Sequence, residues 1–288
     1  MKFKGIVLAG GTGSRLNPLT KSVNKHLLPL FDKPLIYYSL SILMLSNIRE
    51  VLIIVNEKDT SAYKTLLGDG KRFGIKLSYA IQEKPSGIPE AFTIGEHFIK
   101  NSNVALILGD NFFYSQGLSK LLTDSKKKFK GAEIFCYQVK NPNAFGVVEI
   151  RNNQIKSIKE KPKKTNSNLA ISGLYFFDKN VAELSKNLKK SKRNESEIVD
   201  LLKIYMKKKK LNYTIFGRGA AWLDTGTPEN FFEAGSFVYN IEKRQGFKIA
   251  CLEEIAFLNG WINKSKIYES IKFYGTCSYS DYLKKLVE

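Results

Sequence analysis

The chain has 288 residues, with 46 Lys or Arg against 27 Asp or Glu, so its formal net charge is +19. This length suits one large domain or two closely packed ones, and a hydrophobic fraction of 43% excludes a mainly disordered chain. No apolar run approaches the roughly 20 residues of a membrane helix, and the apolar start is too short for a signal peptide. The three cysteines form no CxxC pair, so we expect reduced thiols, no zinc site and a cytoplasmic location.

The positive charge first suggests a nucleic-acid partner. However, 39 of the basic residues are Lys and only seven are Arg, whereas direct base readout depends on bidentate Arg. The Lys-rich runs lie mostly at the ends of expected helices, where the helix dipole stabilises a cation. We therefore expect a solvated Lys-rich surface that attracts anionic metabolites, with no nucleic-acid and no membrane partner.

Strand-like and helix-like segments alternate along the chain. Strands are expected at 5–8, 50–55, 76–81, 104–108, 133–139, 146–150, 154–160, 171–177 and 213–216. Helices are expected at 34–46, 60–67, 90–99, 118–128, 180–188, 195–209 and 228–245. The early strands are continuous apolar runs, as in a parallel sheet covered by helices on both faces. After about residue 130 the strands follow one another through short turns, which indicates antiparallel hairpins.

This pattern predicts an α/β fold with a doubly wound, mostly parallel, Rossmann-like sheet, antiparallel additions and a helical C-terminal segment. We expect one domain over residues 1–235, and a segment at 236–288 that serves packing, oligomerisation or regulation.

A glycine-rich turn follows the first strand and contains Gly10, Gly11, Thr12 and Gly13. Such a turn at the carboxyl end of a strand lets backbone N–H groups approach phosphates closely. It matches neither the P-loop nor the dinucleotide-binding pattern. Arg15 adds a permanent cation where a triphosphate would lie, although an ordinary strand-to-helix turn would also account for the glycines.

Two aspartates occupy positions that suit a metal ion. Asp110 follows the apolar strand at 104–108, and Asp224 lies in a second turn. Magnesium is typically held by one or two carboxylates together with phosphate oxygens and water. Taken alone, each aspartate could equally be a turn or helix-cap residue, just as Lys25 could be a surface lysine and His26 a packing residue.

Seven motifs occur in order across nearly the whole chain: LAGGTGSRL, KHLLPLFDKP, LILGDN, FGVVE, KEKP, ISGLYFFD and AWLDTG. Together they resemble the sugar nucleotidyltransferases, most closely the long-form bacterial glucose-1-phosphate thymidylyltransferases. The segments 242–246 and 251–256 are similar to the C-terminal extension of that long form. The resemblance implies an enzyme whose nucleotide-binding part is about 1–115 and whose sugar-phosphate-binding part is about 116–235.

The implied reaction is attack by the phosphate of glucose-1-phosphate on the α-phosphorus of dTTP, giving dTDP-glucose and pyrophosphate. An attacking phosphate is already ionised, so the site needs cations and alignment rather than a general base. By similarity, Arg15 and Lys25 would hold the triphosphate, and Lys161 would hold the sugar phosphate. Asp110 would act with them, and Asp110 and Asp224 would hold Mg²⁺.

The resemblance also assigns binding residues to each substrate. The implied nucleotide-binding residues are Leu8, Gly10, Gly11, Thr12, Gly13, Arg15, Gln82, Pro85, Gly87 and Asp110. The implied sugar-phosphate-binding residues are Asn111, Gly146, Glu160, Lys161, Ser172 and Tyr175, with Glu195 and Glu197 at the outer edge. An amide such as that of Gln82 offers a donor and an acceptor that match the imide edge of thymine, so CTP should be disfavoured.

Several positions depart from the family pattern. His26 stands where glutamine is usual, and Pro89 with Glu90 replaces a typical Ala-Gln pair. Phe145 replaces a frequent tyrosine, and Ala220 is smaller than the usual aromatic residue. These departures leave the finer nucleobase preference open.

Some alternatives therefore stay open: an enzyme that uses UTP or another hexose-1-phosphate, and a paralogue that binds nucleotide sugar without turnover. The resemblance further implies a homotetramer, feedback inhibition by a dTDP-sugar, and a role at the start of dTDP-deoxysugar and cell-surface polysaccharide synthesis.

Overall fold

The computed structural model describes residues 2–191 and 194–288 of the chain. The strands of the first part are β1 Phe3–Leu8, β4 Glu50–Val55, β5 Lys76–Ile81 and β6 Asn103–Leu108. They pair in parallel in the order β6-β1-β4-β5. Their carboxyl ends therefore meet at one edge of the sheet, as the continuous apolar runs predicted.

The remaining strands extend the same sheet beyond β6. They are β8 Ala132–Gln138, β9 Gly146–Arg151, β10 Gln154–Glu160, β11 Leu169–Phe177 and β12 Leu211–Ile215. β11 is antiparallel to β6, β8 and β9, and β9 with β10 forms the expected hairpin. β12 instead pairs in parallel with β8. Within the described residues, these nine strands make one sheet.

Helices cover both faces of this sheet. They are α1 Leu35–Leu45, α2 Thr60–Leu67, α3 Glu90–Ile94, α4 Glu96–Ile99, α5 Leu118–Lys128, α6 Val181–Lys186, α7 Ile198–Lys207, α8 Pro228–Gln245, α9 Leu252–Leu258, α10 Lys264–Tyr274 and α11 Ser278–Lys285. Successive residues of β1 face opposite cores, because Val7 packs with α1 and α5 whereas Ile6 packs with α3, α6 and α7. The predicted doubly wound α/β fold is confirmed.

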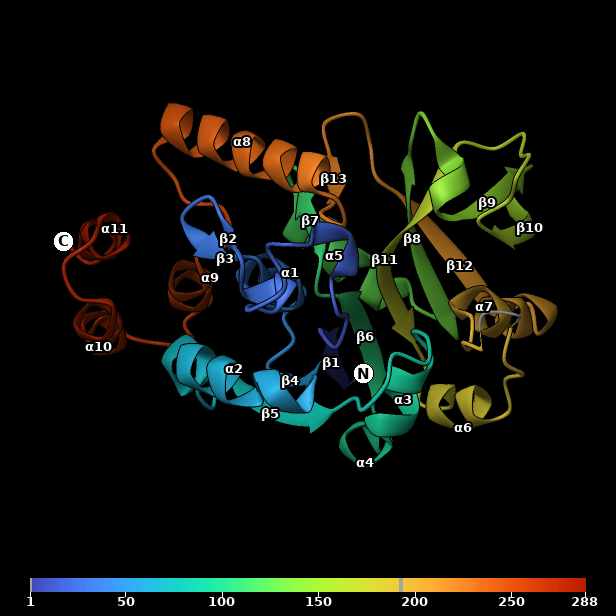
Figure 1. Ribbon diagram of the computed structural model, residues 1–288, viewed down its shortest axis with the longest axis horizontal. Coiled ribbons are helices and arrows are strands. Elements are labelled where there is room, and N and C mark those ends of the chain that lie inside the picture. Colours follow the sequence, from blue (N-terminus) through green and yellow to red (C-terminus); the bar gives the residue numbers. More distant parts are fainter. Residues whose placement is uncertain (1, 192–193) are drawn as a thin grey trace.

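Figure 1 shows where the additions lie relative to the central sheet. The helices α9, α10 and α11 gather at one end of the molecule, and the β9–β10 hairpin with α7 lies at the opposite end. The expected helix at 90–99 is two short helices, because the chain turns out of helical geometry at Gly95 between them. A Cβ atom on Gly95 would lie 2.9 Å from the carbonyl oxygen of Ala91.

Two short strand pairs were not predicted: β7 Asn111–Tyr114 with β13 Ala221–Asp224, and β2 Pro29–Leu30 with β3 Lys33–Pro34. They run for only two to four residues. Such short segments carry too little alternation to be distinguished from loops.

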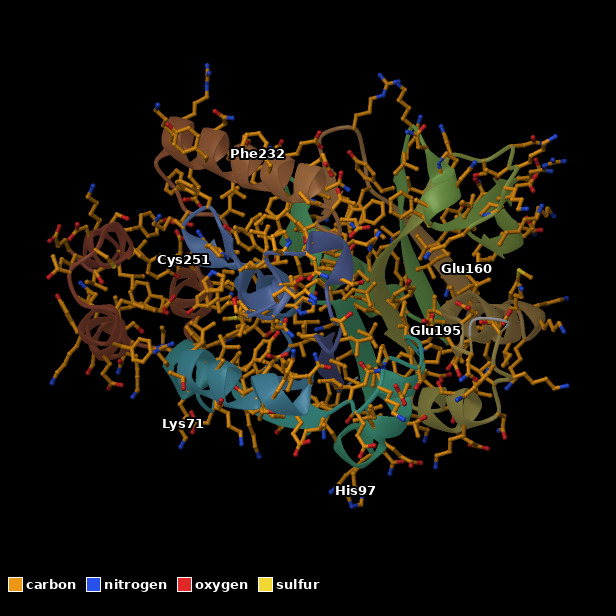
Figure 2. The ribbon with its side chains drawn as sticks, viewed as in Figure 1. Lys71, His97, Glu160, Glu195, Phe232 and Cys251 are labelled. Carbon is orange, nitrogen blue, oxygen red and sulfur yellow. The ribbon has the colours of Figure 1, made fainter. Side chains whose placement is uncertain are left out.

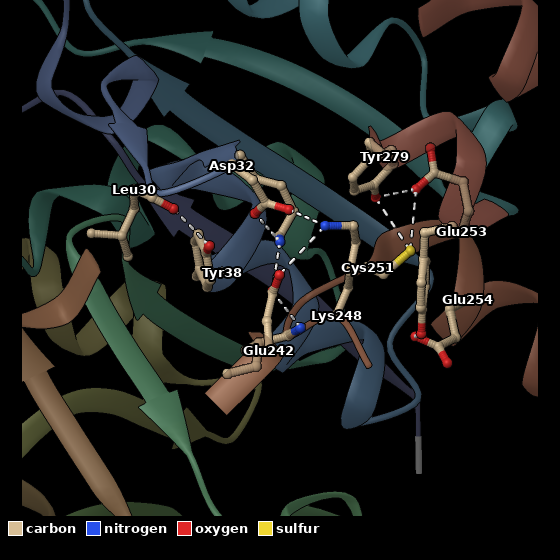
Figure 3. A network of polar contacts seen from close by, with 12 residues as sticks. Leu30, Asp32, Tyr38, Glu242, Lys248, Cys251, Glu253, Glu254 and Tyr279 are labelled. Carbon is tan, nitrogen blue, oxygen red and sulfur yellow. Dashed lines mark hydrogen bonds and ion pairs between the residues drawn. The ribbon is translucent and has the colours of Figure 1, made fainter. Parts of the chain in front are cut away.

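Buried ion pairs attach the C-terminal segment to the β2–β3 hairpin, as Figure 3 shows. Nζ of Lys33 pairs with Asp32 and lies 3.0 Å from Oε1 of Glu242, and Lys248 also contacts both acids. Lys33 is only 2% exposed. Two positive and two negative charges therefore compensate each other at this junction. The division of the chain at residue 235 stays a prediction, and α8 runs through that position.

Candidate active site

The glycine-rich loop after β1 lies against two of the predicted site residues. A Cβ atom on Gly10 would lie 2.4 Å from Oε1 of Gln82, and one on Gly13 would lie 3.0 Å from Cβ of Lys25. Gly13 has a φ of 65°, which glycine adopts at little cost. Its carbonyl accepts a hydrogen bond of 2.8 Å from Oγ1 of Thr20. The loop thus approaches both side chains more closely than a larger residue would allow.

Cations flank this loop. A Cβ atom added to Gly11 would lie 3.6 Å from Cε of Lys25. Arg15 is exposed. Its Nη2 lies close to the backbone of Gly226, 2.6 Å from where a Cβ atom would stand if that residue had one. The guanidinium group therefore bridges the space between the glycine-rich loop and the turn that follows β13.

An ion pair joins two segments at the carboxyl edge of the parallel strands. Nζ of Lys25 contacts Oδ2 of Asp110, and both side chains are largely buried. Nδ2 of Asn111 donates to Oδ1 of the same carboxylate over 3.0 Å. Burial by itself would raise the pKa of Asp110, but the charge of Lys25 and the hydrogen bonds to the carboxylate together outweigh burial and lower this pKa to about 2. Asp110 is therefore ionised at neutral pH.

Asp224 reaches the same place through β13, which sets it opposite Asn111 on β7. The next residue, Thr225, donates from its backbone N and its Oγ1 to the carbonyl of Asp110, over 3.1 and 2.8 Å. Burial and the charge of Asp110 raise the pKa of Asp224, although neighbouring cations oppose the shift. Two carboxylates that disfavour each other's charge in this way favour a bound cation.

A pocket of about 190 Å³ opens beside this pair of acids. The predicted site residues that line it are Arg15, Asp110, Asn111, Gly146, Glu160, Lys161, Tyr175 and Asp224. They come from segments spread over more than two hundred residues of sequence. The structure therefore brings Arg15 and Lys161 together with the predicted acids in one cavity, while Lys25 reaches it through its ion pair with Asp110.

The far side of the pocket is built by the β9–β10 hairpin. Gly146 pairs with Glu160 in this hairpin, and a Cβ atom on Gly146 would lie 3.4 Å from Oε2 of Glu160. Lys161 follows with a φ of 40°, and its backbone N donates to the carbonyl of Phe145 over 3.0 Å. This left-handed turn directs an exposed lysine to the pocket mouth, beside a carboxylate that can accept hydrogen bonds from hydroxyl groups.

The loop after β5 carries the residues expected to contact the nucleobase. Gln82 is buried, and its backbone N donates to the carbonyl of Val55 over 2.8 Å. Gly87 has a φ of 105°, and a Cβ atom there would lie 2.0 Å from the carbonyl oxygen of Ser196. The backbone N of Ser196 in turn donates to the carbonyl of Ser86 over 2.8 Å. The loop is thus clamped onto the segment that precedes α7.

Not every predicted residue lines the pocket. The hydroxyl of Ser172 is fully buried and donates to the carbonyl of Phe135 over 2.8 Å, while its neighbours Ile171 and Gly173 face the cavity. Glu195 and Glu197 lie before α7 and outside the pocket lining, whereas the next residues, 198 and 199, belong to it. Figure 2 shows Glu160 and Glu195 on the same side of the molecule, with His97 far away at the outer edge.

His26 is buried next to the ion pair but does not titrate near neutral pH. Its Nδ1 lies 2.8 Å from Oδ1 of Asn24. Burial, reinforced by the charge of Lys25, lowers the pKa of His26 to about 3. A neutral, enclosed imidazole supports a packing role, in keeping with a reaction that needs no general base.

Sequence reasoning did not assign Trp222 to the site, and it named Phe145 only as a departure from the family pattern. Nε1 of Trp222 donates to Oδ1 of Asn111 over 2.5 Å, and Trp222 packs on Phe145 with ring centroids 5.0 Å apart. Both aromatic residues line the cavity. Their only signal was membership of the AWLDTG and FGVVE motifs, because an isolated aromatic residue is more often part of a core.

Comparison with known proteins gives the class of this one. The nucleotidyl transferase family matches residues 4–240. A glucose-1-phosphate thymidylyltransferase of Neisseria meningitidis is 50% identical over 99% of this chain and 100% of its own length. Another, from Mycolicibacterium smegmatis, is 46% identical over 99% of each chain. The chain therefore belongs to the nucleotidyl transferase family.

Its relatives within that family are named glucose-1-phosphate thymidylyltransferases, which confirms the resemblance inferred from the motifs. A Bacillus anthracis protein described by the same activity and solved with sucrose has a TM-score of 0.76 at 37% identity, covering 82% of this chain and 94% of that one. A UDP-glucose pyrophosphorylase solved with UDP-glucose has a TM-score of 0.73 at 26% identity, covering 84% and 100%. The predicted enzyme class is confirmed.

Proposed function

We propose that this enzyme transfers a thymidylyl group from dTTP to glucose-1-phosphate, which gives dTDP-glucose and pyrophosphate. The observation that carries the proposal is the pocket in which Arg15 and Lys161 meet Asp110 and Asp224. The relatives that are named glucose-1-phosphate thymidylyltransferases support the choice of substrates. The product would enter the synthesis of dTDP-deoxysugars, such as dTDP-rhamnose.

In this proposal the pocket beside Glu160 holds the sugar phosphate. Lys161 at the mouth binds its phosphate, and Glu160 accepts hydrogen bonds from sugar hydroxyls. The glycine-rich loop with Arg15 and Lys25 binds the triphosphate and stabilises the pyrophosphate that leaves. The attacking oxygen is already ionised, so the residues align two anions and neutralise their charge without removing a proton.

The donor set suits Mg²⁺. Asp110 and Asp224 supply hard carboxylate oxygens, and burial together with the charge of Asp110 raises the pKa of Asp224, a cost that a bound cation would relieve. Within the described residues, no group of three or more potential metal ligands occurs, so substrate phosphates and water would complete the coordination. When bound, Mg²⁺ would neutralise charge on the phosphates in the transition state.

The nucleobase would lie against Gln82 and Gly87, with Leu8 and Pro85 beside it. A thymine and a uracil ring present the same imide edge and differ only by a methyl group, whose contact is worth at most about 1–3 kcal/mol. The likeness to a UDP-glucose pyrophosphorylase therefore makes UTP the second candidate nucleotide.

The assay is release of pyrophosphate from dTTP, UTP, CTP and ATP, each with glucose-, glucosamine- or galactose-1-phosphate and Mg²⁺. We expect the highest kcat/KM for dTTP with glucose-1-phosphate. A higher kcat/KM for UTP would move the assignment to the second candidate. No turnover with any pair would contradict an enzymatic role and support a binding paralogue.

The proposal also includes a cytoplasmic homotetramer that is inhibited by a downstream dTDP-sugar. Cys136, Cys251 and Cys277 are all unpaired, which suits a reducing compartment. Within the described residues, no helix combines the length and apolar character needed to cross a membrane. Light scattering would give the assembly state, and inhibition assays with dTDP-rhamnose would test the regulation.

A further inference from the structure

Gln82 is held between the glycine-rich loop and the start of α3. Its Oε1 faces the backbone of Gly10, because a Cβ atom added to Gly10 would lie only 2.4 Å from this oxygen. Its Nε2 donates to Oε2 of Glu90 over 2.6 Å. The amide plane is therefore bounded on one side by the loop that would carry the nucleotide and on the other by a carboxylate.

Glu90 is itself fixed in place. It is the first residue of α3 and follows the buried Pro89. Its Oε2 also accepts a hydrogen bond of 3.3 Å from the backbone N of Ser86, in the nucleobase loop. One carboxylate oxygen thus ties together the loop, the helix and the side chain of Gln82.

A carboxylate accepts hydrogen bonds but cannot donate them, so only one orientation of the Gln82 amide suits Glu90. In the opposite orientation, the two oxygens Oε1 of Gln82 and Oε2 of Glu90 would be in contact at about the 2.6 Å that now separates donor from acceptor. A glutamine at position 90 could donate as well as accept, and would permit both orientations.

We propose that Glu90 is a positioning residue that locks the Gln82 amide with Nε2 toward the carboxylate and Oε1 toward the glycine-rich loop, where the nucleobase would lie. This inference rests on the proposed function, which places the base at Gln82. Thymine and uracil present an N3–H donor next to a carbonyl acceptor and match the locked amide. Cytosine presents the reverse pattern and would need the flipped amide, which Glu90 disfavours.

The test compares kcat/KM for dTTP, dUTP and dCTP with glucose-1-phosphate in the wild type and in Glu90→Gln. A hydrogen bond to a charged group is worth about 1.5–3 kcal/mol, so the dTTP-to-dCTP ratio should fall by about tenfold or more. The dTTP-to-dUTP ratio should not change, because both bases carry the imide edge. Both kcat/KM values in a ratio come from one enzyme preparation, so a loss of active enzyme through partial unfolding lowers them equally and leaves the ratio unchanged. Where turnover of dCTP is too slow, its inhibition constant against dTTP replaces it.

Two further variants separate positioning from general damage. Glu96→Gln removes an exposed acid at the start of α4, where it pairs with the exposed Lys186, and should leave both ratios at the wild-type value. In a Gln82→Ala background, Glu90→Gln should cause no further loss of the dTTP-to-dCTP ratio, because the amide that it orients is gone.

The outcomes are distinct. Turnover of dTTP by the wild type with an unchanged dTTP-to-dCTP ratio in Glu90→Gln would overturn this inference while leaving the proposed function in place. A fall in both ratios would overturn it as well, since it would indicate a loosened pocket. A wild type with no turnover of dTTP would overturn both the proposed function and the inference.

Discussion

Asp110 and Asp224 lie at the same edge of the sheet, yet their surroundings move their pKa values in opposite directions. Lys25 contacts Asp110 directly and lowers its pKa to about 2 against the effect of burial. Burial and the charge of Asp110 raise the pKa of Asp224. The two acids should therefore respond alike in catalysis and differently in stability.

We expect Asp110→Asn and Asp224→Asn each to lower kcat by at least about 100-fold, because each removes a charge that would hold the metal and align the phosphates. Asp110→Asn should also lower the melting temperature, since it leaves the ammonium group of Lys25 without its partner. Asp224→Asn should keep or raise the melting temperature, since it removes a charge that Asp110 disfavours. The measurements are steady-state kinetics and thermal unfolding. Near-full activity of either variant would contradict the metal assignment.

His26→Gln tests the packing role of the buried imidazole. Loss of a general acid or base typically costs about 100-fold or more in rate, so a far smaller change in kcat is expected here. The folded-state pKa is lowered to about 3, so the unfolded chain binds the proton more readily as pH falls below the ordinary value of 6.5. The wild type should lose stability over that range, and the variant should be spared this loss. Urea titrations at a series of pH values would measure it, and a parallel pH dependence of both proteins would contradict it.

At the scale of elements, the site depends on how one loop is clamped to another. Gly87 combines a φ of 105° with a backbone approach to Ser196 that leaves no room for a Cβ atom. The hydrogen bond between Ser196 and Ser86 joins the loop after β5 to the segment before α7. The position of this loop therefore follows from contact between segments that are more than one hundred residues apart.

Gly87→Ala should destabilise the fold by about 1–3 kcal/mol and raise KM for dTTP more than KM for glucose-1-phosphate, because the strained residue forces the loop away from Ser196. Gly217→Ala is the matched control, since nothing lies within 4 Å of a Cβ atom there. Chemical denaturation and kinetics with each substrate varied would measure both effects. Equal changes in the two variants would count against a clamp at Gly87.

The strand pair β7–β13 shows why part of the site could not be predicted from the sequence. Asn111 and Asp224 could be named from motifs, but nothing in a four-residue run predicts that they lie opposite each other in a strand pair. Trp222 bonds Asn111 from that same pair. Long strands with apolar periodicity were predictable, whereas this pairing is decided by contacts across more than one hundred residues.

At the scale of the whole molecule, a buried acid helps to attach the C-terminal helices. Oε1 and Oε2 of Glu253 accept hydrogen bonds of 2.8 and 2.7 Å from the hydroxyls of Tyr274 and Tyr279. The hydroxyl of Tyr274 also lies 2.9 Å from that of Tyr37 on α1. Figure 3 shows the contact of Glu253 with Tyr279 close to the ion pairs around Glu242. This junction joins α9, α10 and α11 to α1.

Burial raises the pKa of Glu253, so the folded state binds its proton more tightly than the unfolded chain does. The stability of the wild type should therefore fall as pH rises above the ordinary glutamate range, through the raised folded-state pKa. Glu253→Gln carries no such proton, so its melting temperature relative to the wild type should increase with pH. Glu269→Gln, at an exposed position on α10, should show a constant difference. A difference that is also constant for Glu253→Gln would contradict a buried, proton-binding carboxyl group.

The sequence by itself determined the α/β class, most strand and helix positions, the motifs and the charged residues needed to handle phosphate, because apolar periodicity and local glycine patterns are properties of short segments. The tertiary structure alone decided which of those residues meet. It paired Lys25 with Asp110, turned Ser172 away from the pocket, and placed Glu90 against Gln82. Such contacts depend on strand order, register and the close approach of distant loops, and no local pattern encodes them.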